Sequence, residues 1–457
     1  MDKVKSTKLG EVVELEVFDL AFGGRGVAKL DGMVVLVHNA VPGDVIKAKI
    51  LKRKRSFAEA EVLEIIKESS KRTQPRCSHF GFCGGCLLQN LKYEYQMEYK
   101  TKQVKDSLVH IGGFKEIKIN PILGSDKLYF YRNKMEFSFD KNEKEELILG
   151  LHPRGRYDQV FDLKECFLQS ELSNKIVSWI RGFFREKKTS VYDLKEHQGF
   201  LRYLAIKEAK STFEVMVNLI SNKGNFPFQE EFAKGLVEKL PQITSVMRNI
   251  NSRLATIAVG EEEVFLAGKD HITEKVGDFL FDLSANSFFQ TNSYQVEKLY
   301  TVVKDFADLK TDDNVLDLYC GIGTISIFLA HQAKKVIGVE SLSQSVEDAQ
   351  RNAQKNKVSN CEFVCGEAKK VLSELITRSE KFDVVVVDPP RAGLHPDVVA
   401  YLGDIKIEKL IYVSCNPATL ARDLKLFCEG GYKIDQVQPV DMFPHTPHIE
   451  TVVKLIL

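Results

Sequence analysis

Hydrophobic and charged positions alternate along the first part of the chain with the period of a β-strand. Val13 and Leu15 are separated by a glutamate, and a glycine-rich break at residues 23–26 leads to a second apolar run at residues 33–37. Residues 9–68 continue in this way and predict five short strands. Short strands at such close spacing favour a small closed barrel.

The fourth predicted strand of this barrel has a basic face. Lys47 and Lys49 alternate with apolar residues, and residues 52–55 are all basic. Residues 47–76 contain ten Lys or Arg and four Glu, which is a local charge of +6. Two interpretations remain open: an edge strand that lysines protect from unwanted pairing, or a barrel surface that holds a nucleic-acid backbone.

The next part of the chain is less regular. The polar residues 69–75 end the barrel segment. An amphipathic helix is predicted after them and stops at Gly112-Gly113; the residues on its apolar face are Met97, Val104, Leu108 and Ile111. Residues 125–285 mix strands and helices, an α+β pattern. Within them, Arg132 and Lys134 are candidates for contacts with RNA phosphates, although exposed strand charges would give the same pattern.

From about residue 290 the pattern changes to helix and buried strand in alternation. Short apolar runs occur at residues 315–318, 336–339, 382–387 and 410–413, and helical segments separate them. Strands without polar alternation are typical of a parallel sheet that helices cover on both faces. This part of the chain therefore predicts a doubly wound α/β domain.

Composition narrows the class of protein. The 457 residues, 44% hydrophobic and 28% charged, are typical of a globular, multidomain chain and exclude a disordered one. The net charge of +1 excludes a globally polycationic nucleic-acid binder, so any basic surface must be local. Residues 1–7 lack the apolar run of a signal peptide, and about 18 consecutive uncharged apolar residues occur nowhere. We therefore expect a cytoplasmic protein without a membrane partner.

Four of the nine cysteines have a spacing that suggests a metal site. Cys77, Cys83 and Cys86 lie in one short segment with two glycines between the last two, and Cys166 follows far downstream. Four thiolates suit either a tetrahedral zinc ion or an iron–sulfur cluster, and the spacing alone does not choose between them. The five-residue gap after Cys77 argues against a radical S-adenosylmethionine enzyme.

A glycine loop at residues 317–324 leaves a predicted strand and opens a helix, so a nucleotide-like ligand can approach its backbone closely. Glu340 ends the next strand, where its carboxylate can accept hydrogen bonds from both ribose hydroxyls. The loop lacks the third glycine of a dinucleotide site, and Thr324 follows its second glycine. Adenosine without phosphates is therefore the expected ligand.

Three further motifs follow strands of the same predicted sheet. Asp388-Pro389-Pro390-Arg391 holds a carboxylate and a guanidinium at the carboxyl end of one strand. Cys415 in Ser414-Cys415-Asn416-Pro417 follows another strand and is a candidate nucleophile, while Glu450 is a candidate proton acceptor. For His445 and His448, in the rigid loop before Glu450, we favour positioning over catalysis.

A thiol, a base and a methyl donor suffice for one particular reaction. Carbon 5 of uracil is too weak a nucleophile to take a methyl group directly. Addition of a thiolate at carbon 6 makes an enolate whose carbon 5 can attack an electrophilic methyl group. A base must then remove the proton from carbon 5 so that the thiolate can leave.

Together these motifs resemble those of the bacterial RNA uracil-5-methyltransferases that use S-adenosylmethionine. The resemblance is strongest in the C-terminal part, while the N-terminal barrel looks like the TRAM RNA-binding module. The cysteine pattern is similar to the [4Fe–4S] site of the members that methylate 23S ribosomal RNA. The resemblance implies three domains: a TRAM-like barrel (residues 1–68), a central domain with the cysteines (69–92 and 125–285), and an S-adenosylmethionine-dependent methyltransferase domain (93–124 and 286–457).

The resemblance also implies the roles of individual residues. Cys415 would be the nucleophile and Glu450 the base. S-adenosylmethionine would be held by Gln290, Tyr319, Glu340 and Asp388, with the Tyr319 ring stacked on adenine. A structural [4Fe–4S] cluster would be bound by Cys77, Cys83, Cys86 and Cys166.

The expected partner is RNA, with the chain acting as a monomer on one or more uridines of 23S ribosomal RNA. A transfer-RNA uracil-5-methyltransferase is the alternative with the same chemistry, but such members generally lack the barrel and the cluster. An RNA cytosine-5-methyltransferase is disfavoured because no second cysteine accompanies Asp388. A noncatalytic RNA-binding or ribosome-assembly factor is disfavoured because Cys415 and Glu450 are both present.

Overall fold

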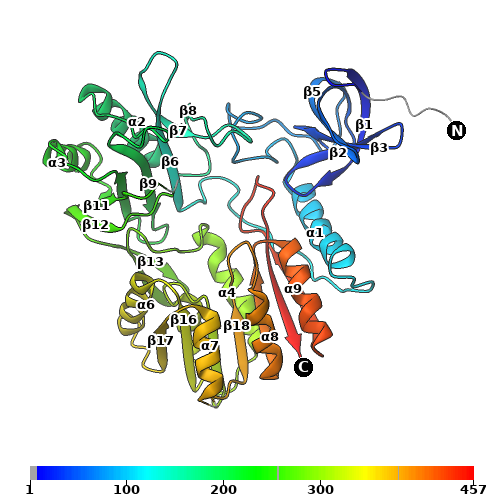
Figure 1. Cartoon of the computed structure of the whole chain (residues 1–457), viewed down its shortest axis with the longest axis vertical. Helices are drawn as coiled ribbons and strands as arrows, with labels where there is room; N and C mark the ends of the chain where they lie inside the picture. Colours follow the sequence, from blue (N-terminus) through cyan, green and yellow to red (C-terminus); the bar gives the residue numbers. More distant parts are fainter. Residues whose placement is uncertain (1–7, 255–256, 379) are drawn as a thin grey trace.

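The computed structural model describes residues 8–254, 257–378 and 380–457, and these residues contain a closed barrel, two seven-stranded sheets and a two-stranded sheet. A barrel, a central sheet and a C-terminal sheet follow one another along the chain, and helix α1 (Tyr93–His110) lies below the barrel beside the C-terminal sheet (Figure 1). Residues 1–7, at the start of the predicted barrel range, lie outside the described residues. None of the described helices is both long and apolar enough to cross a membrane.

The N-terminal segment forms a closed five-stranded barrel, which confirms the prediction from its alternating pattern. The strands occur around the barrel in the order β1-β2-β3-β5-β4, and their bounds are β1 Val12–Ala21, β2 Arg25–Leu30, β3 Met33–His38, β4 Val45–Arg53 and β5 Phe57–Lys67. Leu15 and Val17 are buried inside while the glutamates between the apolar positions are exposed. The period of two therefore separates the core from the solvent side.

The basic face of β4 is matched by acidic residues on β5. Lys47 Nζ lies 2.8 Å from Glu64 Oε2, and Lys49 is paired in register with Glu61. Counting charge along the sequence could not show this pairing, because the acidic residues come from the neighbouring antiparallel strand. The glutamates of β5 are already subtracted in the local charge of +6 over residues 47–76, so the pairing shows which lysines of β4 have counter-charges and leaves the net charge unchanged.

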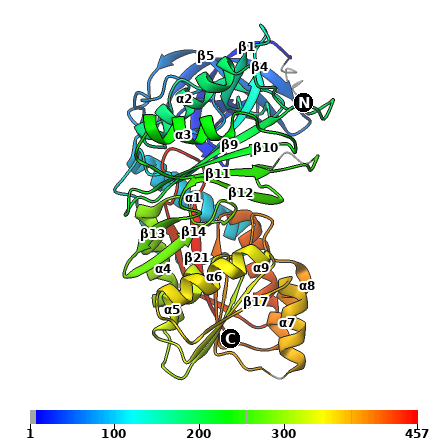
Figure 2. The same cartoon turned by 90° about the vertical axis from the view of Figure 1, so that its left-hand side faces the viewer.

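The central sheet has seven strands in the order β12-β11-β10-β9-β6-β7-β8. Helices α2 and α3 pack against it with Ile180 and Phe232 in its core (Figure 2). A two-stranded sheet of β13 and β14 leads from it to the C-terminal part. The bounds are β6 Lys134–Lys141, β7 Leu147–Leu151, β8 Phe161–Asp162, α2 Glu171–Glu186, β9 Leu201–Glu208, β10 Val215–Ser221, α3 Gln229–Lys239, β11 Ile243–Ile250, β12 Glu262–Gly268, β13 Ile272–Val276 and β14 Phe279–Leu283.

The C-terminal sheet has the order β17-β16-β15-β18-β19-β21-β20. The strands from β17 to β19 are parallel, and β21 is inserted antiparallel between β19 and β20. The bounds are α4 Ser293–Ala307, β15 Asn314–Leu318, α5 Thr324–Ala330, β16 Lys335–Glu340, α6 Ser343–Lys355, β17 Cys361–Cys365, α7 Ala368–Thr377, β18 Val384–Val387, α8 Pro396–Asp404, β19 Lys409–Ser414, α9 Pro417–Glu429, β20 Lys433–Val440 and β21 Glu450–Ile456.

Helices cover both faces of this sheet, as its uninterrupted apolar strands predict. Val384 and Val386 of β18 belong to one buried cluster with α4, α5 and α6, whereas Val385 and Val387 belong to a second cluster with α7, α8 and α9. Successive strand residues point to opposite faces, so a strand of four valines serves both cores. The doubly wound α/β fold is therefore confirmed.

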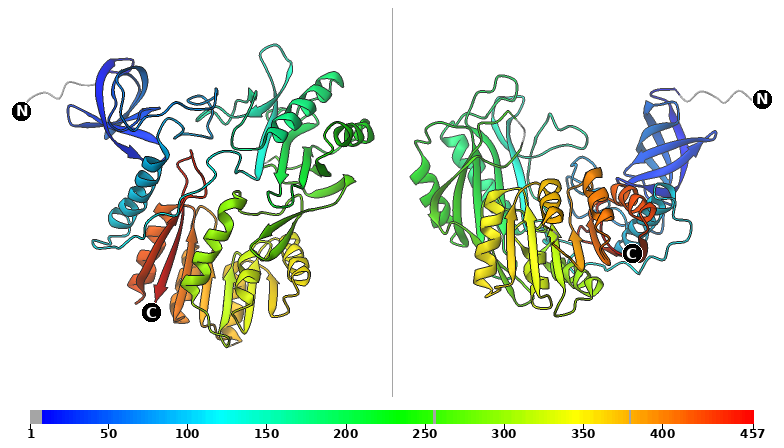
Figure 3. Two further views of the ribbon diagram at one scale, coloured as in Figure 1. Left: turned by 180° about the vertical axis from the view of Figure 1, so that it is seen from behind. Right: turned by 60° about the horizontal axis from the view of Figure 1, so that its bottom comes forward.

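Helix α1 comes early in the chain but packs on the C-terminal sheet. Its Val104 and Leu108 belong to the same buried cluster as α9, and the two helices lie side by side (Figure 3). Ile111, which the pattern placed on the buried face, caps the C-terminus of the helix and is 48% exposed. The division of the chain into 93–124 with 286–457, and 69–92 with 125–285, remains a prediction.

Candidate active site

The carboxyl ends of the parallel strands bring most predicted site residues to one edge of the C-terminal sheet. Tyr319 directly follows β15, and Glu340 ends β16. Asp388 directly follows β18, and Cys415 directly follows β19. Strand β21 runs the other way, so its first residue, Glu450, comes to the same edge. The crevice at this edge is where open α/β sheets bind ligands.

Cys415 and Glu450 are neighbours because β19 pairs with β21. Ser414 is paired in register with Thr451, and the next residue on each strand is Cys415 and Glu450 respectively. Burial, and then the charges of Glu450 and Asp388, raise the pKa of the Cys415 thiol to about 12. Burial, and then Asp388, raise the pKa of Glu450 well above its usual range. The Cys415 thiol therefore carries its proton near neutral pH, and burial favours the protonated form of Glu450.

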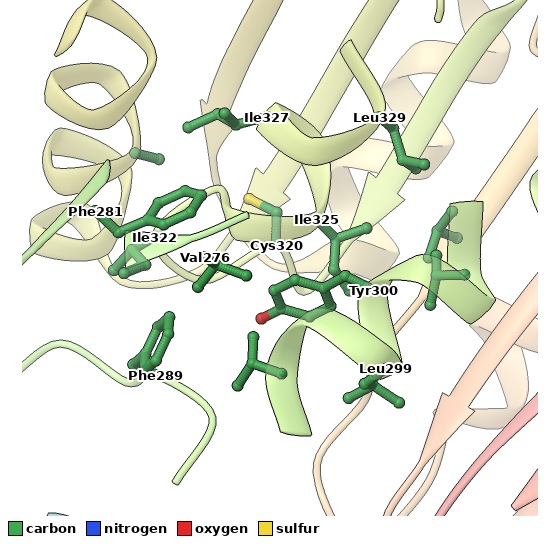
Figure 4. Packing of buried hydrophobic residues seen from close by; sticks show 14 of the residues in the cluster. Val276, Phe281, Phe289, Leu299, Tyr300, Cys320, Ile322, Ile325, Ile327 and Leu329 are labelled. Carbon is green, nitrogen blue, oxygen red and sulfur yellow. The ribbon is translucent and has the colours of Figure 1, made fainter. Parts of the chain in front are cut away.

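Gln290 and Asp388 meet although they are far apart in the sequence. Gln290 Nε2 donates a hydrogen bond to Asp388 Oδ2 at 3.3 Å. The preceding Phe289 is anchored in the apolar core beside Tyr300 and Ile322, which fixes the backbone before Gln290 (Figure 4). Burial raises the pKa of Asp388 to about 7. This pair therefore offers hydrogen-bonding groups to a ligand, and its Asp388 carboxyl group can also carry a negative charge.

The glycine loop and Glu340 also lie at this edge. Tyr319 adopts a left-handed backbone conformation (φ 67°), which a non-glycine residue rarely takes. Glu340 Oε2 accepts a hydrogen bond from Gly321 N at 3.2 Å, and its Oε1 accepts hydrogen bonds from Ser341 N (2.6 Å) and Leu342 N (3.0 Å). These amides fix the direction of the carboxylate. Oε1 also accepts a hydrogen bond from Ser341 Oγ at 2.9 Å, so Oε2 is the oxygen that keeps capacity to accept a hydrogen bond from a hydroxyl group.

Asp317, the first residue of the glycine loop, also lies at this edge, although no role was predicted for it. It is fully buried, and its Oδ2 accepts a hydrogen bond from Ser326 Oγ at 2.6 Å. Burial, together with the charges of Asp388 and Glu340, raises its pKa to about 7. Neither Asp317 Oδ1 nor Glu450 Oε2 has a hydrogen-bond partner among the described residues. Buried polar atoms without partners are costly, so these two oxygens fit a site that a cationic, hydrogen-bonding ligand completes.

Two residues of the central part, Tyr131 and Asn133, support this edge, and sequence reasoning missed them. Tyr131 Oη donates to the carbonyl oxygen of Pro444 at 2.9 Å. Asn133 Nδ2 donates to the carbonyl oxygen of Gln290 at 2.8 Å. Arg132 lies between these two residues in the sequence, and Lys134 follows Asn133. Arg132 Nε donates a hydrogen bond to the carbonyl oxygen of Lys134. Lys134 Nζ lies 2.9 Å from the carboxylate of a glutamate. The two candidate phosphate contacts thus already have partners within the protein.

The four cysteines gather at a different place. Burial and the neighbouring Cys166 and Cys77 raise the pKa of Cys83 to about 11, and burial with the other three cysteines raises that of Cys86 to about 12. All four are free thiols. Thiols that disfavour each other's ionisation suit a cation that would bind them as thiolates. However, no group of three or more Cys, His, Asp or Glu within the described ranges is arranged so that it could hold a metal ion.

Family models match nearly the whole chain. The model for tRNA (uracil-5-)-methyltransferase matches residues 92–457, and the model for the TRAM domain matches residues 6–63. A Clostridium tetani protein described as an uncharacterized RNA methyltransferase is 38% identical, over 100% of this chain and 98% of its own. One with the same description from Halalkalibacterium halodurans is 39% identical, over 98% of this chain and 97% of its own.

A solved structure is similar over the same extent. It is that of the Pyrococcus abyssi tRNA (uracil-54, C5)-methyltransferase in complex with S-adenosyl-L-homocysteine, with 33% identity and a TM-score of 0.78. The match covers 97% of this chain and 100% of that one, so the similarity includes the barrel. The resemblance seen in the motifs is thereby confirmed. The chain belongs to the tRNA (uracil-5-)-methyltransferase family and is an S-adenosylmethionine-dependent RNA uracil-5-methyltransferase with a TRAM domain.

Proposed function

We propose that this protein, as a monomer, methylates carbon 5 of uridine in 23S ribosomal RNA, with Cys415 as nucleophile and Glu450 as base. The observation that carries the proposal is the pairing of β19 with β21, which brings Cys415 beside Glu450 at the ligand-binding edge of the sheet. Burial raises the pKa of both groups, so the thiol must lose its proton before it can add to carbon 6.

S-adenosylmethionine would be held by Gln290, Asp388, Glu340 and Tyr319, and it would supply an electrophilic methyl group and a positive charge. A positive charge beside the buried carboxyl groups favours their ionised forms and that of the Cys415 thiol. Tyr319 offers an aromatic face for adenine, and the oriented Glu340 carboxylate can accept hydrogen bonds from the ribose hydroxyls.

The reaction on uracil proceeds in three steps. The Cys415 thiolate forms a bond to carbon 6 while the 5,6 double bond opens to an enolate. Carbon 5 then takes the methyl group, and the bond between that methyl group and the donor's sulfur breaks. Glu450 finally removes the proton from carbon 5, the double bond forms again, and the thiolate leaves. Glu450 is suited to this last step because its raised pKa makes its carboxylate a stronger base.

We further propose that Cys77, Cys83, Cys86 and Cys166 bind a [4Fe–4S] cluster, which would fix the loop of residues 77–86. The spacing of the four cysteines supports this assignment, whereas within the described ranges no such group of side chains is arranged to hold a metal ion. Anaerobically purified protein should contain about four iron atoms per chain and absorb visible light. Zinc, or no bound metal, would contradict the proposal. Cys428→Ala is a matched control that should keep all the iron.

Transfer RNA is the second candidate substrate. The Pyrococcus abyssi protein is named for a tRNA uracil and matches 97% of this chain, so the presence of a barrel does not by itself favour 23S ribosomal RNA. The cysteine pattern remains the support for 23S ribosomal RNA. An assay can decide between the two substrates. The protein is incubated with methyl-labelled S-adenosylmethionine and with unmodified 23S ribosomal RNA or unmodified transfer RNA, and the labelled nucleoside is then identified. Labelled 5-methyluridine from 23S RNA alone is expected; label only in transfer RNA, or in 5-methylcytidine, would overturn it.

A further inference from the structure

The segment just before Glu450 is held mainly by residues from elsewhere in the chain. We call residues 441–449, between β20 and β21, the strap. Glu450 is the first residue after it, and among the described residues no donor forms a hydrogen bond with Glu450 Oε2. The direction of this carboxyl group therefore depends on the backbone that carries it. Whatever fixes the strap also fixes the proposed base.

Helix α1 holds the first residues of the strap. Lys100 Nζ donates to Asp441 Oδ1 at 2.7 Å and to the carbonyl oxygen of Phe443 at 3.0 Å. The side chains of Lys100 and Asp441 are 1% and 0% exposed. Asp441 directly follows Val440, which is the cross-strand partner of Glu450. The buried ion pair thus lies next to Glu450 across the strand ladder.

Two other residues of α1 hold the same strap. Tyr93 Oη donates to Asp441 Oδ2 at 2.9 Å. Gln96 Oε1 accepts a hydrogen bond from His445 N at 2.9 Å, at a point where His445 adopts a left-handed conformation (φ 66°). A non-glycine residue keeps such a conformation only where its surroundings enforce it. Helix α1 therefore anchors both the beginning and the turn of the strap.

We propose that Lys100 is a positioning residue for the proton-removal step: it acts through Asp441 and the strap to aim the Glu450 carboxylate at carbon 5 of uracil. This inference rests on the proposed role of Glu450. Removal of one partner of a buried ion pair leaves the other charge without compensation, so the strap must rearrange. Cys415 is carried by β19 and not by the strap, so its addition to carbon 6 should not depend on Lys100.

The two steps can be measured separately. RNA that contains 5-fluorouridine has no proton to lose at carbon 5, so the covalent adduct is trapped, and its rate of formation reports on Cys415 addition and methyl transfer. Ordinary RNA requires proton removal for turnover. If Glu450 is misplaced, turnover on ordinary RNA should therefore be slow and the covalent adduct should accumulate. The adduct with the fluorinated substrate should still form at the normal rate.

The test compares Lys100→Met with Lys102→Met. Both lysines are on α1 and both form ion pairs, but Lys102 pairs with Asp19 and Asp106 at the surface. Lys100→Met should lower turnover on uridine RNA about 100-fold, as expected for a displaced catalytic group. Its adduct formation with 5-fluorouridine RNA should stay within about threefold of the original rate. Lys102→Met should change neither rate.

Two outcomes would overturn the inference. Equal loss of adduct formation and turnover in Lys100→Met would indicate general damage to the site, and unchanged turnover would exclude a role in positioning. If Lys100→Met does not fold, Tyr93→Phe replaces it in the test, because it removes one hydrogen bond from the same Asp441 carboxylate. Turnover of Tyr93→Phe on uridine RNA should fall about fivefold, while its adduct formation with 5-fluorouridine RNA should not change. Glu450→Gln is measured in parallel. Normal turnover in Glu450→Gln would refute the role of Glu450 as the base. Slow turnover in Glu450→Gln together with normal turnover in Lys100→Met would refute only the positioning role of Lys100.

Discussion

The edge of the C-terminal sheet and the surface of the barrel both carry charged side chains, but the two regions arrange them in opposite ways. At the edge, Asp317, Asp388 and Glu450 are enclosed by protein, and burial raises the pKa of each. On the barrel, Lys47 and Glu64 are about half exposed and lie 2.8 Å apart. Among the described residues the three carboxyl groups of the first region form no ion pair, although the charge of Arg391 acts on Glu450, whereas the second region supplies counter-charges for its basic face.

This difference indicates where a ligand is required. Enclosing carboxyl groups that form no ion pair costs folding free energy, so the fold tolerates them only where something else gains from them. Exposed ion pairs contribute little to stability and are common on surfaces. Local charge in the sequence pointed to the barrel, whereas unsatisfied polar atoms in the structure point to the edge of the sheet.

The largest expected effect concerns the thiol at the edge. Cys415→Ala removes the group that adds to carbon 6, so methylation should fall by at least about a thousandfold and no adduct should form with 5-fluorouridine RNA. Cys428→Ala, a half-buried thiol on α9 away from the site, is the control and should remain active. Turnover of Cys415→Ala near the original rate would show that Cys415, and with it this edge of the sheet, does not take part in the reaction.

A smaller loss is expected from the carboxyl group beside it. Asp388→Asn keeps a hydrogen-bond acceptor for Gln290 but removes the negative charge, so the Kd for S-adenosylmethionine should rise roughly tenfold or more. Calorimetry measures this change, and Asp397→Asn serves as the control because Asp397 forms an exposed pair with Lys369. An unchanged Kd would mean that the carboxyl groups of the edge do not face the methyl donor.

The pH dependence of binding sharpens the same comparison. Asp317 and Asp388 have pKa values of about 7 in the free protein, and a cationic ligand favours their ionised forms. The Kd for S-adenosylmethionine should therefore fall as pH rises from 6 to 8, by up to about tenfold per unit for each proton released. S-adenosylhomocysteine lacks the sulfonium charge and should show a shallower slope. Equal slopes for the two ligands would contradict an electrostatic role.

The stability of the free protein should change with pH in the opposite sense. Carboxyl groups with a raised pKa in the folded state stabilise the fold below the unfolded pKa of about 4, and this contribution is lost as pH rises through about 7. In Asp388→Asn this part of the pH dependence should be reduced. Denaturant titrations between pH 5 and 8 measure it.

The smallest effect is expected on the barrel. Lys47→Ala removes one exposed ion pair, so the denaturation midpoint should not change measurably. Because Glu64 already pairs with Lys47, RNA affinity at moderate salt should also change little. A clear loss of affinity with a smaller salt dependence would show that this lysine contacts phosphates, and would restore the barrel face as a binding surface.

Most of the architecture follows from local patterns that can be read in the sequence. Alternation in the barrel and unbroken apolar runs in the C-terminal sheet depend on neighbouring residues alone. Because parallel strands share a carboxyl edge, the positions of Asp388 and Cys415 after their strands were enough to predict that they meet. Family resemblance supplied Gln290, whose link to Asp388 crosses much of the chain.

What could not be predicted depends on contacts between distant segments. The neutralising partner of Lys47 is on another strand, and the anchoring lysine of the strap, Lys100, is separated by 341 residues from Asp441. Asp317 has a raised pKa because of complete enclosure, which no local pattern reports. Pairings of this kind are set by tertiary packing, so only the structure shows them.

The insertion of β21 between β19 and β20 has a consequence for the order of synthesis. Both neighbours leave the ribosome before β21, so until residues 450–456 are made neither of them has its partner strand on this side. A nascent chain therefore carries Cys415 without Glu450 beside it, and with unpaired strand edges that quality-control proteases and chaperones can recognise. Closure of the sheet therefore brings the proposed nucleophile and the proposed base together in a single step.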